Sequence, residues 1–174
     1  MSNPLHAFFV RIPVFSGLSI EELEDIVRIV RPIEVPEGQL LFTEGAVGDA
    51  AFVVQGGLIE IFRKVEGKDV TVCRFGPYEL FGELALLDGA PRSASARALE
   101  ATSLLRIDKA QFDALRRQLR PAAFVVIRSI AVTLSGRIRE TNAQVAALLA
   151  PEPEPEARPV SKGGLLKRLL GGDR

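Results

Sequence analysis

Residues 50–75 read AAFVVQGGLIEIFRKVEGKDVTVCRF, and this stretch decides the fold class of the chain. Three short runs rich in Val, Ile and Phe are separated by Gly56-Gly57 and by the turn residues 66–69. In LIEIFRKV, successive side chains face opposite sides of a strand, which places Glu60 and Ile61 on different faces. Short runs of this kind, joined by glycine-rich turns, are typical of antiparallel sheets.

The same pattern extends outward over residues 33–108. The further runs are IEV, QLLF and TSLLRI, and Gly, Pro or Asp bounds each of them. Many short strands at regular spacing predict an antiparallel sandwich or barrel of jelly-roll type. Cys73 alternates within VTVCRF like a strand residue, and we predict a plain buried thiol there.

Helical patterns flank the strands on both sides. Residues 5–31 read as a helical entry segment, with Ser19 and Glu22 in capping-box spacing and Pro32 as its stop. After the strands, a short helix is predicted over 109–117. Pro121 suits the first turn of a long helix that reaches about Ala150.

Apolar residues on the long helix recur at alternating spacings of four and three, which is the seam of a coiled coil. This seam either packs on the chain's own barrel or joins two copies. Because it continues beyond what a small barrel covers, we favour a homodimer through the helix 121–149. The seam positions are Ile127, Ala131, Leu134, Ile138, Thr141, Val145 and Leu148.

Composition excludes several functional classes. The 174 residues are 47% hydrophobic and 25% charged, and 22 basic residues balance 22 acidic ones, so overall charge does not favour nucleic acid. One cysteine makes no internal disulfide, and with His6 as the sole histidine the chain lacks the ligands of a jelly-roll metalloenzyme. The sequence also shows no nucleophile–base pair that would suggest another kind of enzyme. Without a long apolar run or a signal-peptide pattern, we expect a cytoplasmic protein with no transmembrane segment.

Three segments are expected along the chain: a domain over 1–150, a Pro/Glu linker over 151–160 (PEPEPEARPV), and a short amphipathic tail over 161–174. The tail places Leu residues on one helical face opposite Lys167 and Arg168. It is either disordered alone, a docking peptide for an unidentified partner protein, or a weak contact for anionic membranes.

The stretch FGELALLDGAPRSASARA, residues 81–98, carries the candidate chemistry. If residues 82–88 form a short helix, Gly82 lets a ligand approach closely, and the N–H groups of Leu84 and Ala85 face an anion. Glu83 suits a ribose 2′-OH, and the guanidinium of Arg92 suits phosphate oxygens. Small residues leave room for the ligand and add donors: Ser93, Ala94, Ser95 and Ala96.

A cyclic ribose phosphate offers all of these partners at once. The alternative is structural, namely a Glu83–Arg92 ion pair that closes a loop. Surface ion pairs contribute only about 0–1 kcal/mol, so a loop does not require this arrangement.

FGELALLDGAPRSASARA resembles the phosphate-binding cassette of the cyclic nucleotide-binding domain family, F-G-E-x-A-L followed by R-[ST]-A. EGAVGDAAFVVQGGLIEIF resembles the same family's E-G-x-x-G-D motif, and the match covers roughly residues 8–149. The resemblance implies a mainly β fold: an eight-stranded antiparallel jelly roll, N-terminal helices and a long C-terminal dimerisation helix. It places Gly82 and Glu83 at the ribose, and Leu84, Ala85, Arg92 and Ser93 at the cyclic phosphate.

On the long helix, SGRIRETNAQV resembles the bacterial catabolite-activator branch, which makes Arg137, Thr141 and Asn142 candidate adenine contacts. Ser93 is the residue of the cAMP-binding activators, whereas cGMP-selective members often carry Thr, so we expect cAMP rather than cGMP. The activator branch continues into a helix-turn-helix domain, for which 161–174 is too short, and no kinase motif or channel segment is present.

We therefore expect a non-catalytic cyclic-nucleotide receptor that acts on a partner protein and not on DNA. The alternatives are a receptor for cGMP or a cyclic dinucleotide, and a scaffold that keeps the fold without a ligand.

Overall fold

The computed structural model describes residues 4–149, and the chain divides into two compact units, Met1–Arg137 and Ile138–Arg174. The first unit begins with helices α1 (Pro4–Phe9) and α2 (Ile20–Ile29). The predicted capping box of α2 is confirmed, because Glu22 N donates to Ser19 Oγ (3.2 Å) and Ser19 N donates to the Glu22 carboxylate (2.8 Å).

The predicted N-terminal helices are confirmed, but the expected end of the helical segment 5–31 at Pro32 is wrong. The chain already becomes a strand at Val30, so that Pro32 lies inside that strand opposite Leu105. Proline is tolerated there because the strand is at a sheet edge.

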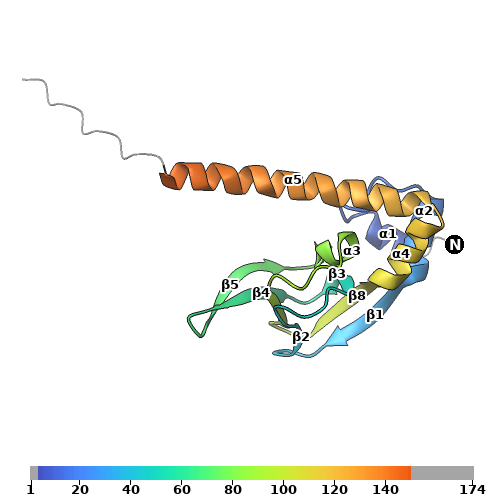
Figure 1. Ribbon diagram of the computed structural model, residues 1–174. Coiled ribbons are helices and arrows are strands. Elements are labelled where there is room, and N and C mark those ends of the chain that lie inside the picture. Colours follow the sequence, from blue (N-terminus) through green and yellow to red (C-terminus); the bar gives the residue numbers. More distant parts are fainter. Residues whose placement is uncertain (1–3, 150–174) are drawn as a thin grey trace, which may run out of the picture. The chain divides into compact units, whose positions relative to one another are not determined.

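Eight strands form two four-stranded antiparallel sheets (Figure 1). Sheet A has the order β1-β8-β3-β6 and sheet B the order β2-β7-β4-β5. The predicted mainly β, eight-stranded fold with flanking helices is therefore confirmed. The strands are β1 (Val30–Val35), β2 (Leu40–Phe42), β3 (Ala50–Gly56), β4 (Ile59–Val65), β5 (Lys68–Phe75), β6 (Leu80–Phe81), β7 (Ser95–Ala98) and β8 (Thr102–Asp108).

Two strands lie outside the six runs recognised in the sequence. β6 has only two residues, and β7 is the sequence SARA, whose residues have no marked strand preference. β7 nevertheless pairs with both β2 and β4, and its Ala96 and Ala98 are almost fully buried between the sheets.

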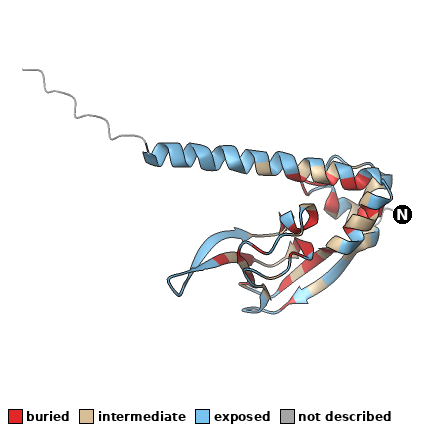
Figure 2. Cartoon of the chain, in the orientation of Figure 1, coloured by how far each residue is buried: buried red, intermediate tan, exposed pale blue. Residues whose placement is uncertain are grey.

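Sheet A is covered on both faces, so that one hydrophobic core lies on each side of it (Figure 2). Alternate residues of β3 divide between them: Phe52 packs with sheet B, whereas Val53 packs with the helices. Leu104 and Leu105 of β8 divide in the same way. Burial on both faces explains why β3 reads as a continuous apolar run instead of an alternating one.

Three further helices complete the described chain: α3 (Leu84–Leu87), α4 (Lys109–Arg117) and α5 (Pro121–Leu149). The last two confirm the predicted helices, with Pro121 at the first helical position of α5. Among residues 4–149, α5 is the one helix long and apolar enough to span a membrane by length and composition. Its first turns pack into the helix-side core through Ala122, Ala123, Val126 and Ile130.

In the second unit the described residues are 138–149, the last turns of α5. All of them are exposed, including the seam residues Ile138 (61% exposed), Val145 (48%) and Leu148 (84%). The linker 151–160 and the tail 161–174 lie outside the described residues.

A buried acid stabilises sheet B on the face opposite Ile59. Glu60 of β4 is only 4% exposed, and its Oε2 accepts a hydrogen bond from Arg97 Nε of β7 (2.8 Å). Its Oε1 accepts from Thr71 Oγ1 of β5 (2.7 Å). The Thr71 hydrogen bond outweighs burial and, together with Arg97, holds the pKa of Glu60 below its ordinary value. The cluster thus joins three strands through one carboxylate.

We expect Glu60→Gln to lower the free energy of unfolding by about 1–3 kcal/mol at pH 7, because charge-assisted hydrogen bonds are lost in a buried site. The folded-state pKa of Glu60 lies below its unfolded value, so its charge stabilises the fold above the unfolded pKa. This stabilisation disappears as the pH falls through the folded pKa.

Urea unfolding of both proteins at several pH values between 7 and 3 measures the effect. The gap between wild type and variant should narrow on acidification, and a gap that stays constant or widens contradicts the assignment. Glu34→Gln, an exposed acid of β1, is the control and should change stability by no more than about 0.5 kcal/mol.

Candidate functional site

A cavity of ≈ 490 Å³ opens between sheet B and the segment that follows β6. Its apolar floor includes Phe42, Ile61, Phe75 and Phe81, from four strands of the sandwich. Its polar groups are Glu83, Arg92, Ser93, Arg63, Asp88 and Arg137. An apolar pocket of this volume with a few convergent polar groups has the features of a small-molecule site.

The predicted residues up to Arg137 all line this cavity. They are Gly82, Glu83, Leu84, Ala85, Arg92, Ser93, Ala94 and Arg137. Ser93 is exposed and Ala94 is buried. Thr141 and Asn142 belong to the second unit, where both are exposed on α5.

Gly82 makes the turn between β6 and α3. Its φ is 67°, a left-handed conformation that favours glycine, and an added Cβ would meet Arg92 Nη1 at 2.8 Å. The helix that follows is shorter than the predicted 82–88, since α3 spans only Leu84–Leu87. The Ala85 N–H is not free for an anion as predicted, because it donates to the Gly82 carbonyl oxygen (3.2 Å).

Arg92 is buried at the centre of the cavity wall, with 8% of its surface exposed. Its Nη2 donates to the Ala50 carbonyl oxygen (2.7 Å) and to Asp49 Oδ1 (3.4 Å), and its Nη1 donates to the Gly82 carbonyl oxygen (3.3 Å). The guanidinium also lies over the Phe42 ring, 4.2 Å from its centroid. Within residues 4–149, the buried Nε of Arg92 has no hydrogen-bond partner.

Burial lowers the pKa of Arg92, and the nearby Asp49 opposes this shift. Asp49 is in turn held by Arg106 of β8, whose Nη2 donates to Asp49 Oδ2 (2.8 Å). Burial raises the pKa of Asp49, but the hydrogen bond from Arg106 and its charge outweigh it, so the net shift is downward. Asp49 therefore remains a carboxylate that positions Arg92.

Glu83 does not pair with Arg92. It is buried (8% exposed), and its Oε1 accepts a hydrogen bond from Arg137 Nη1 of α5 (3.0 Å). The structural alternative of a Glu83–Arg92 pair closing a loop is therefore wrong. Instead, Glu83 joins the segment after β6 to α5, whereas Arg92 joins it to β3.

Several lining residues were not predicted from the sequence. Cys73 is exposed and lines the cavity with Val72, so the expectation of a buried thiol is wrong: β5 is an edge strand, and every residue from Lys68 to Arg74 is exposed. Asp49 belongs to the E-G-x-x-G-D motif, but the sequence did not reveal that it accepts a hydrogen bond from Arg92, 43 positions away.

Gly48 of the same motif has no room for a side chain, because an added Cβ would lie 2.4 Å from the Ala90 carbonyl oxygen.

The described residues 4–149 contain no group of three or more His, Cys, Asp or Glu side chains arranged to hold a metal ion. Four charged residues that line the cavity, Arg63, Glu83, Arg92 and Arg137, are in ion pairs, and the hydrogen-bonding position without a partner among the described residues belongs to a guanidinium. This chemistry suits an anionic organic ligand.

Gly82→Ala tests the contact between Gly82 and Arg92. We expect it to lower the free energy of unfolding by about 2–3 kcal/mol, from backbone strain and displacement of the guanidinium. Gly67→Ala is the matched control, since Gly67 has φ 81° but open space around an added Cβ, and should lose only about 1 kcal/mol. If urea unfolding shows equal losses of unfolding free energy for the two variants, the position of the Arg92 guanidinium does not depend on a glycine at position 82.

The comparisons with known proteins agree with this geometry. The model of the cyclic nucleotide-binding domain matches residues 32–118. The Cyclic AMP receptor protein of Thermus thermophilus is 37% identical over 161 residues, which cover 92% of this chain and 71% of that protein. The CRP-like cAMP-activated global transcriptional regulator of Mycobacterium tuberculosis is 28% identical over 80% of this chain and 61% of its own length.

Among solved structures, the crystal structure of the Thermus thermophilus Catabolite Activator Protein superimposes with a TM-score of 0.69 at 36% identity. The superposition covers 78% of this chain and 62% of that one. The chain thus spans somewhat less than two thirds of the second relative and of this crystal structure. From the family match, the Thermus relative and the shared fold, we conclude that the chain belongs to the cyclic nucleotide-binding domain family.

Proposed function

We propose that the chain is a non-catalytic receptor for a cyclic nucleotide, with cAMP preferred to cGMP, which signals to a partner protein by a conformational change. One observation carries the proposal: Arg92 lines the apolar cavity, and within residues 4–149 its buried Nε has no hydrogen-bond partner. A buried donor without an acceptor is unfavourable, and an anionic oxygen from a ligand removes that cost.

The cavity suits each part of a cyclic ribose phosphate. The cyclic phosphodiester has one negative charge, which the guanidinium of Arg92 would neutralise next to the small residues Ser93 and Ala94. Glu83 would accept the ribose 2′-OH at Oε2, since Oε1 already accepts from Arg137. We propose that the base lies toward Val72 and Cys73 of β5 and the surface of α5.

This arrangement would connect the ligand with α5. Glu83 would accept from the ribose through one oxygen and from Arg137 through the other, so a bound nucleotide would bias the position of both groups. A ligand shifts a conformational equilibrium by its different affinity for the two states, and the shared carboxylate supplies such a difference. Thr141 and Asn142 remain proposed base contacts.

The assignment to binding rests on the state of the charged groups. Glu83 and Asp49 are both held in ion pairs with arginines, which supports a role for the two carboxylates in holding the arginines of the site in place. The Thermus and Mycobacterium relatives are described as a receptor and a regulator, which supports the same class. A scaffold without a ligand is the alternative, and a cyclic dinucleotide is the alternative ligand.

Calorimetric titration with cAMP, cGMP and a cyclic dinucleotide tests the receptor. We expect binding of cAMP, and a loss of about 2 kcal/mol or more, roughly 30-fold in Kd, in Arg92→Ala because the phosphate charge loses its partner. Arg28→Ala, an exposed arginine of α2, is the control and should bind like wild type. No heat with any of the nucleotides rejects the receptor, and an unchanged affinity in Arg92→Ala rejects the site.

We also propose a homodimer through α5. The seam residues Ile138, Val145 and Leu148 are exposed in the single chain, and a second copy of the same helix would cover them. A continuous apolar stripe of this length is unfavourable in water unless another surface buries it.

Multi-angle light scattering measures the dimer. Leu134→Glu with Ile138→Glu should halve the mass, because charges in the seam repel across the interface. Leu134 also packs partly against the helix-side core, so Ile138→Glu with Val145→Glu is a second variant that avoids the core. Arg139→Glu with Ala143→Glu, outside the seam, should keep the dimer. A dimer that survives both seam variants contradicts the proposal.

The remaining expectations stay proposals. We propose a domain over residues 1–150, a cytoplasmic location and partner binding by the tail 161–174 on the basis of sequence patterns. The linker and the tail lie outside the described residues, and α5 satisfies the length and composition of a membrane span while its first turns are in the core.

A further inference from the structure

The end of α4 has an unusual residue. Arg120 N donates to the Leu115 carbonyl oxygen and Leu119 N to the Arg116 carbonyl oxygen, both at 3.0 Å, which is the Schellman pattern of a helix end. That pattern requires a left-handed residue, most often glycine, and here Leu119 occupies the position with φ 54°. The side chain of Leu119 is 74% exposed and packs in neither core. The fold therefore keeps a strained leucine that does not contribute to its cores.

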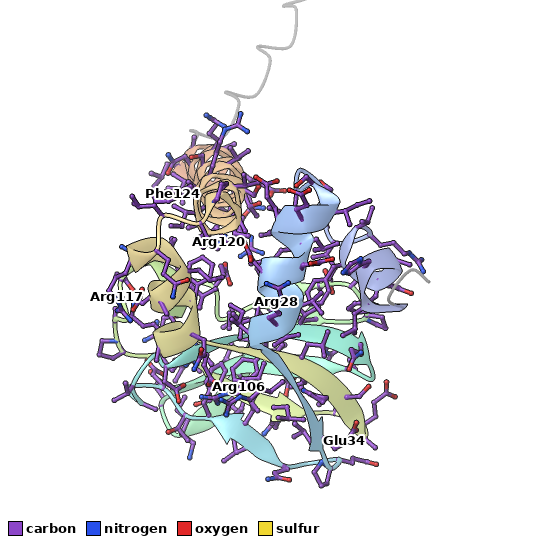
Figure 3. The ribbon with its side chains drawn as sticks, turned by 90° about the vertical axis from the view of Figure 1, so that its right-hand side faces the viewer. Arg28, Glu34, Arg106, Arg117, Arg120 and Phe124 are labelled. Carbon is purple, nitrogen blue, oxygen red and sulfur yellow. The ribbon has the colours of Figure 1, made fainter. Side chains whose placement is uncertain are left out.

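A groove of ≈ 410 Å³ lies at the corner between α4 and α5, and its lining includes Arg117, two residues before Leu119. It is lined by Lys109, Arg116 and Arg117 of α4, together with Asp113 and Phe124. Phe124 is 48% exposed although it stands near the start of a helix whose other side is buried. Figure 3 looks onto this side of the molecule, where Arg117 and Phe124 both lie at the surface. We call these five residues and Leu119 the corner patch.

The corner patch is positively charged. Lys109 and Arg116 share the single carboxylate of Asp113, at 2.9 Å and 3.0 Å. Within residues 4–149, Arg117 makes no ion pair. A partly exposed aromatic side chain and an exposed leucine close to Arg116 and Arg117 match the composition of interface centres, where aromatic residues and Arg are enriched.

The corner patch is connected to the candidate site through Lys109. An added Cβ on Gly89, just after α3, would meet Lys109 Cε at 2.7 Å, so the lysine stem packs directly on this segment. The Lys109 N–H also donates to the Asp49 carbonyl oxygen (2.8 Å), and Asp49 positions Arg92. A movement of the segment 82–92 would therefore displace one side of the groove.

We propose that the corner patch docks an acidic segment of a partner protein that packs an apolar side chain against Phe124 and makes a second contact with the exposed Leu119 of the adjoining turn. Charge complementarity determines the acidic character of the partner segment, and the groove of ≈ 410 Å³ has room for one of its side chains. This inference goes beyond the proposed receptor function, because it assigns the output surface, and it stands without knowledge of the nucleotide.

Selection from a displayed library of random 12-residue peptides on the immobilised full chain tests the proposal. We expect enrichment of peptides rich in Asp and Glu around one aromatic or aliphatic residue. An enriched peptide, labelled and measured by fluorescence anisotropy, should bind at least tenfold more weakly to Arg117→Glu and fivefold more weakly to Phe124→Ser. Its affinity should fall as NaCl is raised from about 0.05 to 0.5 M.

Leu119→Gly separates docking from folding. Glycine relieves the left-handed strain, so this variant should raise the midpoint of thermal unfolding while it weakens peptide binding at least threefold. Lys64→Glu, an exposed cation near the end of β4, is the charge control and should bind within twofold of wild type.

The proposal is overturned if no peptide is enriched, if the enriched peptides are not acidic, or if the corner variants bind like wild type. Co-sedimentation with phosphatidylcholine–phosphatidylserine vesicles that Arg117→Glu abolishes, without peptide enrichment, assigns the patch to membranes and also overturns it. Calorimetry with cAMP on the same variants distinguishes the two proposals, because a failed receptor with intact peptide binding affects only the proposed function.

Discussion

The buried guanidinium of Arg92 is the constraint on which the arrangement of the site depends. A charge in this position is unfavourable unless hydrogen bonds and a counter-charge surround it. The Ala50 and Gly82 carbonyl oxygens, Asp49 and the ring of Phe42 provide this environment. These partners come from β2, β3, the loop before β3 and the turn after β6, so assembly of the sandwich is what brings them together. Within residues 4–149 the buried Nε has no hydrogen-bond partner, and Arg92 is one of the residues that line the cavity.

Because sheet A is buried on both faces, the same strands pack beneath the cavity on one side and against the helices on the other. Phe52 and Phe81 belong to the core between the sheets, beneath the cavity, whereas Val53 and Leu80 of the same strands pack with the helices. Two polar connections leave the cavity in addition: Glu83 reaches α5 through Arg137, and Asp49 reaches β8 and the start of α4. A change at the segment 82–92 therefore has physical routes to both helices.

Local patterns in the sequence predicted the local elements, and long-range contacts explain what was missed. The capping box at Ser19 and the strand runs depend on neighbours within a few residues, so they were correct. β7 was missed because the sequence SARA becomes a strand only through pairing with its two partner strands. The exposure of Cys73 was missed because alternation along a strand does not show which face is covered. The lining residues within 82–94 followed from the chemistry of that stretch, and Arg137 followed from a family resemblance. The pairing of Glu83 with Arg137 was not foreseen, because the two residues are 54 positions apart, and nothing in the sequence near Leu119 indicates its left-handed backbone.

If the Nε of Arg92 donates to the phosphate of a bound cyclic nucleotide, its surroundings change when the ligand binds. Nitrogen-15 NMR of the arginine Nε–H groups, assigned with Arg92→Lys, measures this change. We expect saturating cAMP to shift the Arg92 signal and to slow its exchange with water, whereas adenosine, which has no phosphate, leaves the signal in place. An Arg92 signal that does not move at saturating cAMP would show that the phosphate does not bind to this guanidinium.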